Sequence, residues 1–281
     1  MRLTPVFDVS KMARPVVTEQ PFAVVPEKIA PQAPAEAASA IASIKDSPSL
    51  ARTALRYAGF AFCGWLAAVL SLIVVYRFFD PPFSSRMAGQ WLTGQSIEQT
   101  FVPIETISPN VVRAVLLSED GRFCDHFGVD LDEMQAAIER AKGGIPRGAS
   151  TISMQLTKNL FLWSSKSYVR KVIEIPLTLA IEALWPKRRI MEIYLNIAEW
   201  GPGVFGVEAA AQYHFGKPAA RLSEREAAQL AVTLPNPIRR DAGDPGPQTQ
   251  RLAGDIQARM HAASASATQC VETRVRAASG R

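Results

Sequence analysis

Residues 118–130 read SEDGRFCDHFGVD and form the first of three charged clusters along this chain. The second is RGASTISMQLTKN at residues 147–159, and the third is RKVIE at residues 170–174. Each cluster sets ionisable side chains beside an apolar run, where a merely structural charge would be costly to keep. Together they supply two carboxylates and several cations, which can deprotonate a hydroxyl group and hold an anionic leaving group. The pattern predicts group transfer from a phosphate-bearing donor.

The sequence around these clusters predicts a mainly α-helical domain. Ser108-Pro109 is a typical helix start, because proline fits the first helical position, and that helix would end at the acid pair Glu119-Asp120. Glycines at 201, 203 and 206 predict a flexible loop, and residues 99–104 give the best strand signal. Further helices are expected from Asp130 or Asp132 to Gly143-Gly144, from Ser150-Thr151 onward, over 168–185 and 187–198, and after the capping box Ser223-x-x-Glu226.

One stretch is apolar and long enough to cross a membrane. Residues 57–76 carry no charge, and at ~1.5 Å per residue they cover about 30 Å, the hydrocarbon thickness of a bilayer. Arg52 and Arg56 before this stretch lean slightly towards a cytoplasmic N-terminus. We therefore divide the chain into a disordered cytoplasmic tail (1–53), a transmembrane helix (54–79), a catalytic domain (80–240) and a C-terminal tail (241–281) with room for a short helix over 249–263.

Composition narrows the classes of partner. The chain of 281 residues carries a formal net charge of +5, which favours an anionic partner such as phospholipid, nucleic acid or pyrophosphate. Nucleic acid is the weaker choice, because the basic residues are scattered and no recognised reading motif is present. The three cysteines, Cys63, Cys124 and Cys270, are far apart and form neither a CxxC pair nor a metal-binding spacing, so no disulfide framework is expected.

The clusters resemble the ordered signatures of glycosyltransferase family 51, the peptidoglycan transglycosylases. Residues 118–130 resemble the first signature, 147–162 the second, 170–217 the third and fourth, and 222–237 the last. The match covers about residues 102–237. Because only a tail follows, without a penicillin-binding Ser-x-x-Lys domain, the resemblance is to the monofunctional biosynthetic members of the family.

The resemblance implies a lysozyme-like α-helical domain, preceded here by one transmembrane helix. It also implies polymerisation of lipid II into β-1,4-linked glycan strands, with inversion at the anomeric carbon and release of undecaprenyl pyrophosphate. The expected place is a bacterial inner membrane, with the N-terminus in the cytoplasm and the catalytic domain in the periplasm. Expected partners are lipid II, the growing glycan strand, membrane lipid and a cell-wall synthesis or division complex, with no nucleic acid.

The same resemblance assigns roles to individual residues. Glu119 matches the catalytic glutamate, which would act as general base on the acceptor's sugar 4-hydroxyl. Glu174 matches the second glutamate, whose task would be to position a divalent cation (Mg²⁺ or Mn²⁺) or the basic residues that hold the pyrophosphate. No organic cofactor is expected. The expected substrate contacts are Ser150, Thr151, Gln155, Lys158, Asn159, Arg170 and Lys171.

Supporting roles are expected for four further residues of the signatures. Asp120 would orient the loop after Glu119 or support that glutamate, Phe123 would be core, and His126 would cap or hydrogen-bond the loop. Asn196 would tie its helix to the cleft wall.

Two positions depart from the family pattern. Met154 stands where many members have glutamine, so the cleft either loses one hydrogen-bonding group or the position is one of packing. Pro176 lies inside a predicted helix and is expected to kink it.

Two other classes of function compete with the polymerase. A muramidase-like lytic enzyme would need one protonated carboxyl group of a pair, whereas the second glutamate here is surrounded by cations, which suits an anionic leaving group. A catalytically silent envelope scaffold would have no need of Glu119 and Glu174.

Overall fold

The computed structural model describes residues 50–142, 148–165 and 167–272. Most of the tail predicted over residues 1–53, and the predicted helix end at Gly143-Gly144, lie outside the described residues, as does Arg147 of the second cluster. The chain divides into two compact units, Met1–Phe60 and Ala61–Arg281, and the described residues after Phe60 carry the predicted site.

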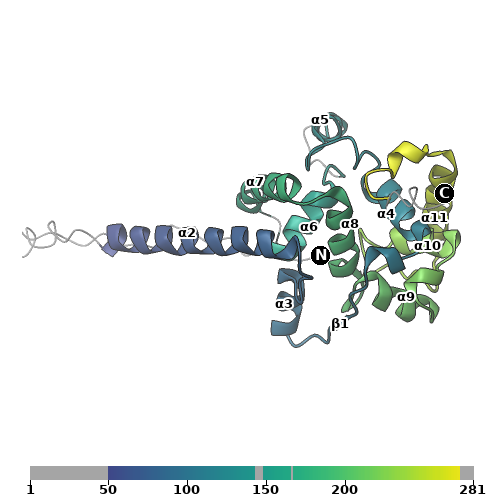
Figure 1. Cartoon of the computed structure of the whole chain (residues 1–281), viewed down its shortest axis with the longest axis horizontal. Coiled ribbons are helices and arrows are strands. Elements are labelled where there is room, and N and C mark those ends of the chain that lie inside the picture. Colours follow the sequence, from purple (N-terminus) through teal and green to yellow (C-terminus); the bar gives the residue numbers. More distant parts are fainter. Residues whose placement is uncertain (1–49, 143–147, 166, 273–281) are drawn as a thin grey trace, which may run out of the picture. The chain divides into compact units, whose positions relative to one another are not determined.

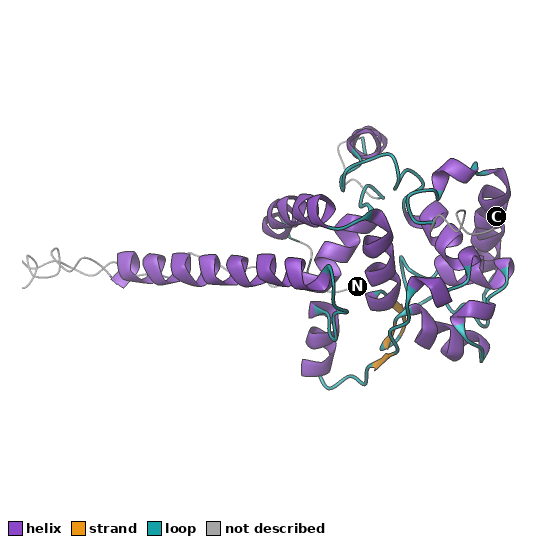
Figure 2. Ribbon diagram, in the orientation of Figure 1, coloured by secondary structure: helices purple, strands orange, loops and turns teal. Residues whose placement is uncertain are grey.

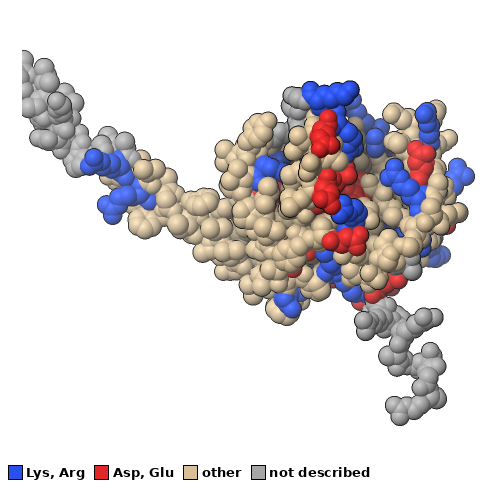
Figure 3. Space-filling model, turned by 90° about the horizontal axis from the view of Figure 1, so that it is seen from above, with Lys and Arg blue, Asp and Glu red and all other residues tan. Residues whose placement is uncertain are grey.

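The long apolar helix α2 covers Leu50–Tyr76, and its stretch Arg52–Tyr76 is long and apolar enough to cross a membrane. Past Arg52 and Arg56 its surface carries no charged side chain, as the space-filling view shows (Figure 3). The last turns of α2 belong to the second unit, where the carbonyl oxygen of Ile73 accepts a hydrogen bond from Trp185 Nε1 at 2.7 Å. The helix therefore ends against the folded domain.

The domain after α2 is mainly α-helical, as predicted (Figures 1 and 2). Its helices begin where the sequence places capping residues: Pro109 is at the first position of α4, Asp130 caps α5, and Ser223 with Glu226 forms a capping box on α10. The elements after α2 are α3 (Ser85–Leu92), β1 (Glu98–Gln99), η1 (Ile104–Thr106), α4 (Pro109–Glu119), α5 (Leu131–Arg140), α6 (Ile152–Phe161), α7 (Tyr168–Leu184), α8 (Lys187–Ile197), β2 (Glu199–Gly201), β3 (Val204–Phe205), α9 (Val207–Phe215), η2 (Ala219–Arg221), α10 (Glu224–Ala231), α11 (Pro247–Ala262) and η3 (Ala265–Ala267).

A small sheet replaces the flexible loop predicted from the glycines. The order is β1-β3-β2, with β1 parallel and β2 antiparallel to β3. Gly203 has φ +73°, and a Cβ atom there would lie 2.4 Å from the backbone oxygen of Ser96. The glycine therefore permits a close backbone approach that holds the turn in place, so the prediction of a flexible loop is wrong.

The core brings the three charged clusters together. Helix α6 packs against both α7 and α8, and α4 packs against α10 and α11. Leu116 of α4, Leu156 of α6 and Ile193 of α8 are fully or almost fully buried. Because these helices share one core, the end of α4 and the N-terminal halves of α6 and α7 meet at one site.

The C-terminal region departs from the predicted tail. Helix α11 matches the short helix expected over 249–263, but it packs on α4 and α10 and buries Ala253, Ile256 and Met260. A disulfide joins Cys124 to Cys270, 146 residues later. The expectation of no disulfide is therefore wrong, because spacing along the sequence says nothing about which cysteines the fold brings together. The folded domain extends beyond residue 240.

Candidate functional site

Glu119 is the last residue of α4 and faces helix α6. Its Oε2 accepts a hydrogen bond from Gln155 Nε2 at 3.0 Å, and its Oε1 accepts a longer one from the Ser118 hydroxyl at 3.4 Å. Burial raises the pKa of the Glu119 carboxyl, while these hydrogen bonds and the charges of Lys158 and Arg240 oppose the rise. A carboxylate with a raised pKa and neutral partners is suited to accept a proton.

Gln155 joins Glu119 to helix α8. Its Oε1 accepts a hydrogen bond from the Tyr194 hydroxyl at 3.1 Å, so one amide bridges the tyrosine and the glutamate. Burial and the nearby carboxylates raise the pKa of Tyr194 well above its ordinary value, which keeps the hydroxyl protonated and donating. Gln155 was predicted to contact substrate; in the structure its side chain hydrogen-bonds Glu119 and also lines a hollow, and the substrate contact stays a prediction.

Asp120 holds the loop that follows Glu119. It is buried, and its Oδ1 lies 2.9 Å from His126 Nε2, while its Oδ2 accepts a hydrogen bond from the backbone N–H of Ile152 at 2.9 Å. The supporting roles predicted for Asp120 and His126 agree with these contacts. Phe123 is fully buried in the core, as predicted, and the Lys187 ammonium lies 4.3 Å from its ring centroid.

Apart from Glu119 and its partners, the site contains a second group of charged side chains, which surrounds Glu174. Glu174 is 2% exposed, and its two oxygens form ion pairs with Arg170 and with Lys171, the latter at 2.9 Å. Both oxygens are therefore occupied by cations of the same helix, α7. A carboxylate held in this way fixes the positions of its two cationic partners.

Lys158 completes this group from helix α6. Burial lowers the pKa of its ammonium, as do the charges of Arg170, Arg86 and Lys171, whereas Glu174 opposes the shift. The Lys158 ammonium makes no hydrogen bond or ion pair with any residue that the structure describes. Three cations thus gather around a single carboxylate, and the group carries excess positive charge.

The remaining predicted contacts divide between site and scaffold. The Ser150 hydroxyl lies 3.5 Å from the Lys171 ammonium. Asn159 and Lys158 line the same hollow. Thr151 caps α6, and its buried hydroxyl also donates to the carbonyl oxygen of Gly128 at 2.5 Å. Its hydroxyl is engaged in scaffold hydrogen bonds, while the residue also lines the hollow that contains Glu119, so its substrate contact stays a prediction.

Asn196 joins helix α8 to the segment around Val102, in line with the expected role. Its amide exchanges two hydrogen bonds of 2.9 Å with the backbone of Val102. The departure at Met154 is one of packing, because the side chain is fully buried. Pro176 lies inside α7, which continues through it to Leu184.

Two hollows flank the bridge between Glu119 and Gln155. One, of about 410 Å³, is lined by Glu119, the 148–151 segment and Arg259. The other, of about 190 Å³, is lined by Gln155, Lys158 and Tyr194. Glu119 thus lines one hollow, and Lys158 and Arg86 line the other.

The residues present do not fit a metal site made by protein ligands. Both Glu174 oxygens already face cations, and no group of three His, Cys, Asp or Glu side chains suited to a metal ion occurs among the described residues. A divalent ion prefers several oxygen ligands around it. The possible metal role predicted for Glu174 thus finds no support in this donor set.

Sequence reasoning missed three residues that the fold brings to the site. Tyr194 stands two positions before Asn196 in the same motif, so a search of that helix face could have found it. Arg86 of α3 forms an ion pair with buried Glu199, with Nε 2.8 Å from Oε2, and both line the hollow that contains Lys158. Arg259 lies within residues 241–281, the predicted C-terminal tail, where no local sequence signal indicates a site residue.

Comparisons with known proteins identify the family of this chain. Residues 85–261 match the family model described as transglycosylase. The chain is 54% identical over 193 residues to a biosynthetic peptidoglycan transglycosylase of Agrobacterium fabrum, covering 68% of this chain and 85% of the relative. It is 49% identical over 208 residues to a protein of the same name from Rhodospirillum centenum, covering 73% of this chain and 90% of the relative. The chain therefore belongs to the transglycosylase family.

Proposed function

We propose that this peptidoglycan glycosyltransferase polymerises lipid II into β-1,4-linked glycan strands with inversion at the anomeric carbon. The supporting observation is the double role of helix α6. Its Gln155 holds Glu119, and its Lys158, one turn later, lies among the cations around Glu174. The helix thus places a base and an anion-binding group at fixed positions on one face.

The reaction follows from these positions. The Glu119 carboxylate takes the proton of the acceptor's sugar 4-hydroxyl as that oxygen attacks the anomeric carbon of the donor. The bond between the anomeric carbon and the pyrophosphate oxygen breaks, and its electron pair leaves with undecaprenyl pyrophosphate. Lys158, Arg170 and Lys171 stabilise the developing negative charge, which fixed cations do more strongly in a buried cleft than in water.

The ion pairs of Glu174 favour transfer over lytic hydrolysis. An inverting or retaining hydrolase needs a protonated carboxylic acid to assist its alcohol leaving group. Both oxygens of Glu174 are paired with Arg170 and Lys171, and the positive charge of these residues suits a pyrophosphate leaving group. We infer that these cations, without a resident metal ion, neutralise the leaving group.

We also propose that the N-terminus is cytoplasmic and the catalytic domain periplasmic. The Cys124–Cys270 disulfide supports this orientation, because disulfides persist in the oxidising periplasm and are rare in the cytosol. Arg52 and Arg56 at the start of α2 agree with it through the positive-inside rule. Alkaline phosphatase fused after residue 272 should be active, as expected for a periplasmic domain. An inactive fusion would indicate the opposite orientation.

The decisive experiment is polymerisation of dye-labelled lipid II by the detergent-solubilised full chain, followed by muramidase digestion of the product. Wild type should form muramidase-sensitive polymer, and Glu119→Gln should form none. Activity that survives excess EDTA would support the inference that the leaving group is neutralised without a resident metal ion. Cleavage of preformed glycan without polymerisation would instead identify a lytic enzyme.

A further inference from the structure

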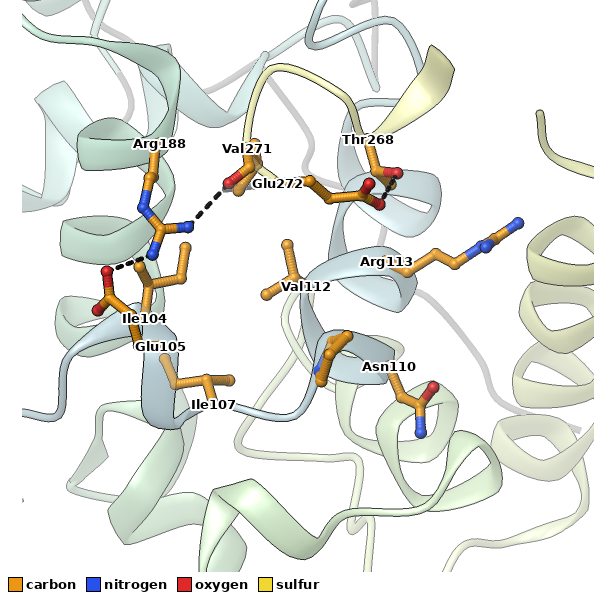
Figure 4. A pocket seen from close by; sticks show the side chains of 11 residues that line it. Ile104, Glu105, Ile107, Asn110, Val112, Arg113, Arg188, Thr268, Val271 and Glu272 are labelled. Atoms are coloured by element: carbon orange, nitrogen blue, oxygen red, sulfur yellow. Dashed lines mark hydrogen bonds and ion pairs between the residues drawn. The ribbon is translucent and has the colours of Figure 1, made fainter. Parts of the chain in front are cut away.

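Residues 263–272, here called the C-terminal strap, follow α11 and are fastened to three elements. The carbonyl oxygen of Ala263 accepts a hydrogen bond from Arg113 Nη2 at 2.9 Å. Cys270 forms the disulfide with Cys124. The carbonyl oxygen of Val271 accepts a hydrogen bond from Arg188 Nη1 at 2.9 Å, as Figure 4 shows.

Each of these anchors belongs to an element that carries part of the site. Arg113 is on α4, which ends at Glu119. Cys124 lies in the loop of residues 120–128, which contains Asp120 and His126. Arg188 is on α8, which supplies Tyr194. The strap is therefore fastened to three elements that border the site, while α6 supplies Gln155, the direct partner of Glu119.

The strap is held by its anchors and by the buried residues Thr268 and Val271, and a hollow interrupts its packing. A hollow of about 480 Å³ separates part of it from the start of α4, and Figure 4 shows Val271 and Glu272 on one side with Val112 and Asn110 on the other. None of the signature acids lines this hollow. Where packing is interrupted, the discrete links decide where the segment lies, and the disulfide is the covalent one among the described residues.

The disulfide adds a second fastening to a loop that α8 also holds. On the α8 side, Lys187 donates to the carbonyl oxygen of His126 at 2.8 Å and contacts the Phe123 ring. On the strap side, Cys124 is fixed by Cys270, whose backbone N–H also points to the Cys124 sulfur at 3.4 Å. The loop is thus fastened to both α8 and the strap.

We propose that the Cys124–Cys270 disulfide is a positioning link for the catalytic base, so that the rate of glycan polymerisation depends on the link being oxidised. This inference rests on the proposed function. Reduction removes the covalent fastening to the strap, and the loop then holds Asp120, and through it the end of α4, less firmly. Since small displacements of a reacting group have large kinetic costs, we expect kcat to fall about tenfold while KM for lipid II changes little.

The test compares oxidised and reduced full-length enzyme at one temperature. Folded wild type is treated with dithiothreitol, which reduces the disulfide to two thiols while closing to its own cyclic disulfide, and thiol labelling with mass spectrometry verifies the reduction. A Cys124→Ser/Cys270→Ser double variant should have the same low kcat and no response to reductant. Cys63→Ser, in the apolar helix, is the control and should respond to reductant as wild type does.

Each outcome decides the proposal. A reversible loss of kcat with near-UV circular dichroism retained, restored on reoxidation, supports it. Unchanged kcat after complete reduction overturns it, and so does a loss that accompanies unfolding, because the link would then only stabilise the fold. Should the double variant fail to fold, reduction of folded wild type still decides. Oxidised wild type that forms no polymer would instead refute the proposed function.

Discussion

Two glutamates of the same site are held in opposite ways. Glu119 has neutral partners, Gln155 and Ser118, and burial raises its pKa. Glu174 is more deeply buried but is paired with two cations. The first can therefore exchange a proton, and the second organises positive charge. The difference shows that the partners of a buried carboxylate decide its role, because burial alone is common to both.

Removing the carboxylate charge at the base should have the largest effect. Glu119→Gln keeps the size of the side chain and its hydrogen bonding but cannot accept a proton, so we expect kcat to fall about 10²–10⁴-fold. Lipid II turnover measured by released undecaprenyl pyrophosphate checks this. Glu139→Gln, on the exposed face of α5, is the control. A fall of less than tenfold would mean that another group takes the proton.

Removing the unpaired cation should have the next largest effect. Lys158→Met keeps the length of the side chain and removes the charge that faces the leaving group, so kcat/KM should fall about 10²-fold. The same turnover assay measures it, with Lys217→Met, whose charge is paired with Glu226, as the control. Near-normal activity would mean that Arg170 and Lys171 bind the anion without Lys158.

Neutralising the second glutamate should have a smaller effect. In Glu174→Gln the cations keep their charge but lose the ion pairs that orient them, so we expect kcat to fall about tenfold through misplacement of the binding groups. Comparing this variant with Glu119→Gln at several pH values sharpens the contrast between the two glutamates. If both lost activity equally and with one pH dependence, the assignment of one base and one positioning residue would fail.

The smallest effect is expected at the bridge between Gln155 and the base. The hydrogen bond from Gln155 lowers the pKa of Glu119, so Gln155→Leu should raise that pKa further. Because the reaction needs the deprotonated carboxylate, the acid limb of the kcat/KM profile should then move to higher pH. Gln212→Leu, on the exposed surface of α9, is the control. An unmoved limb, or one at lower pH, would contradict the bridge.

Much of the fold could be predicted because its signals are local. Pro109, Asp130 and the Ser223-Glu226 box start their helices where their backbone preferences require, and the uncharged run in α2 is long enough to be recognised by itself. Strands β2 and β3 were not predicted. Position 203 requires glycine because its backbone approaches that of Ser96, which is remote in sequence.

The sequence by itself determined the helices, the apolar span and the order of the charged clusters, since these depend on neighbouring residues. Only the tertiary structure decided what each polar group does. It joined Gln155 to Glu119 and Tyr194, linked the Thr151 hydroxyl to the carbonyl oxygen of Gly128, and brought Cys270 to Cys124. The reason is physical: the pKa and hydrogen bonds of a buried group depend on the atoms packed around it, and those atoms come from distant parts of the chain.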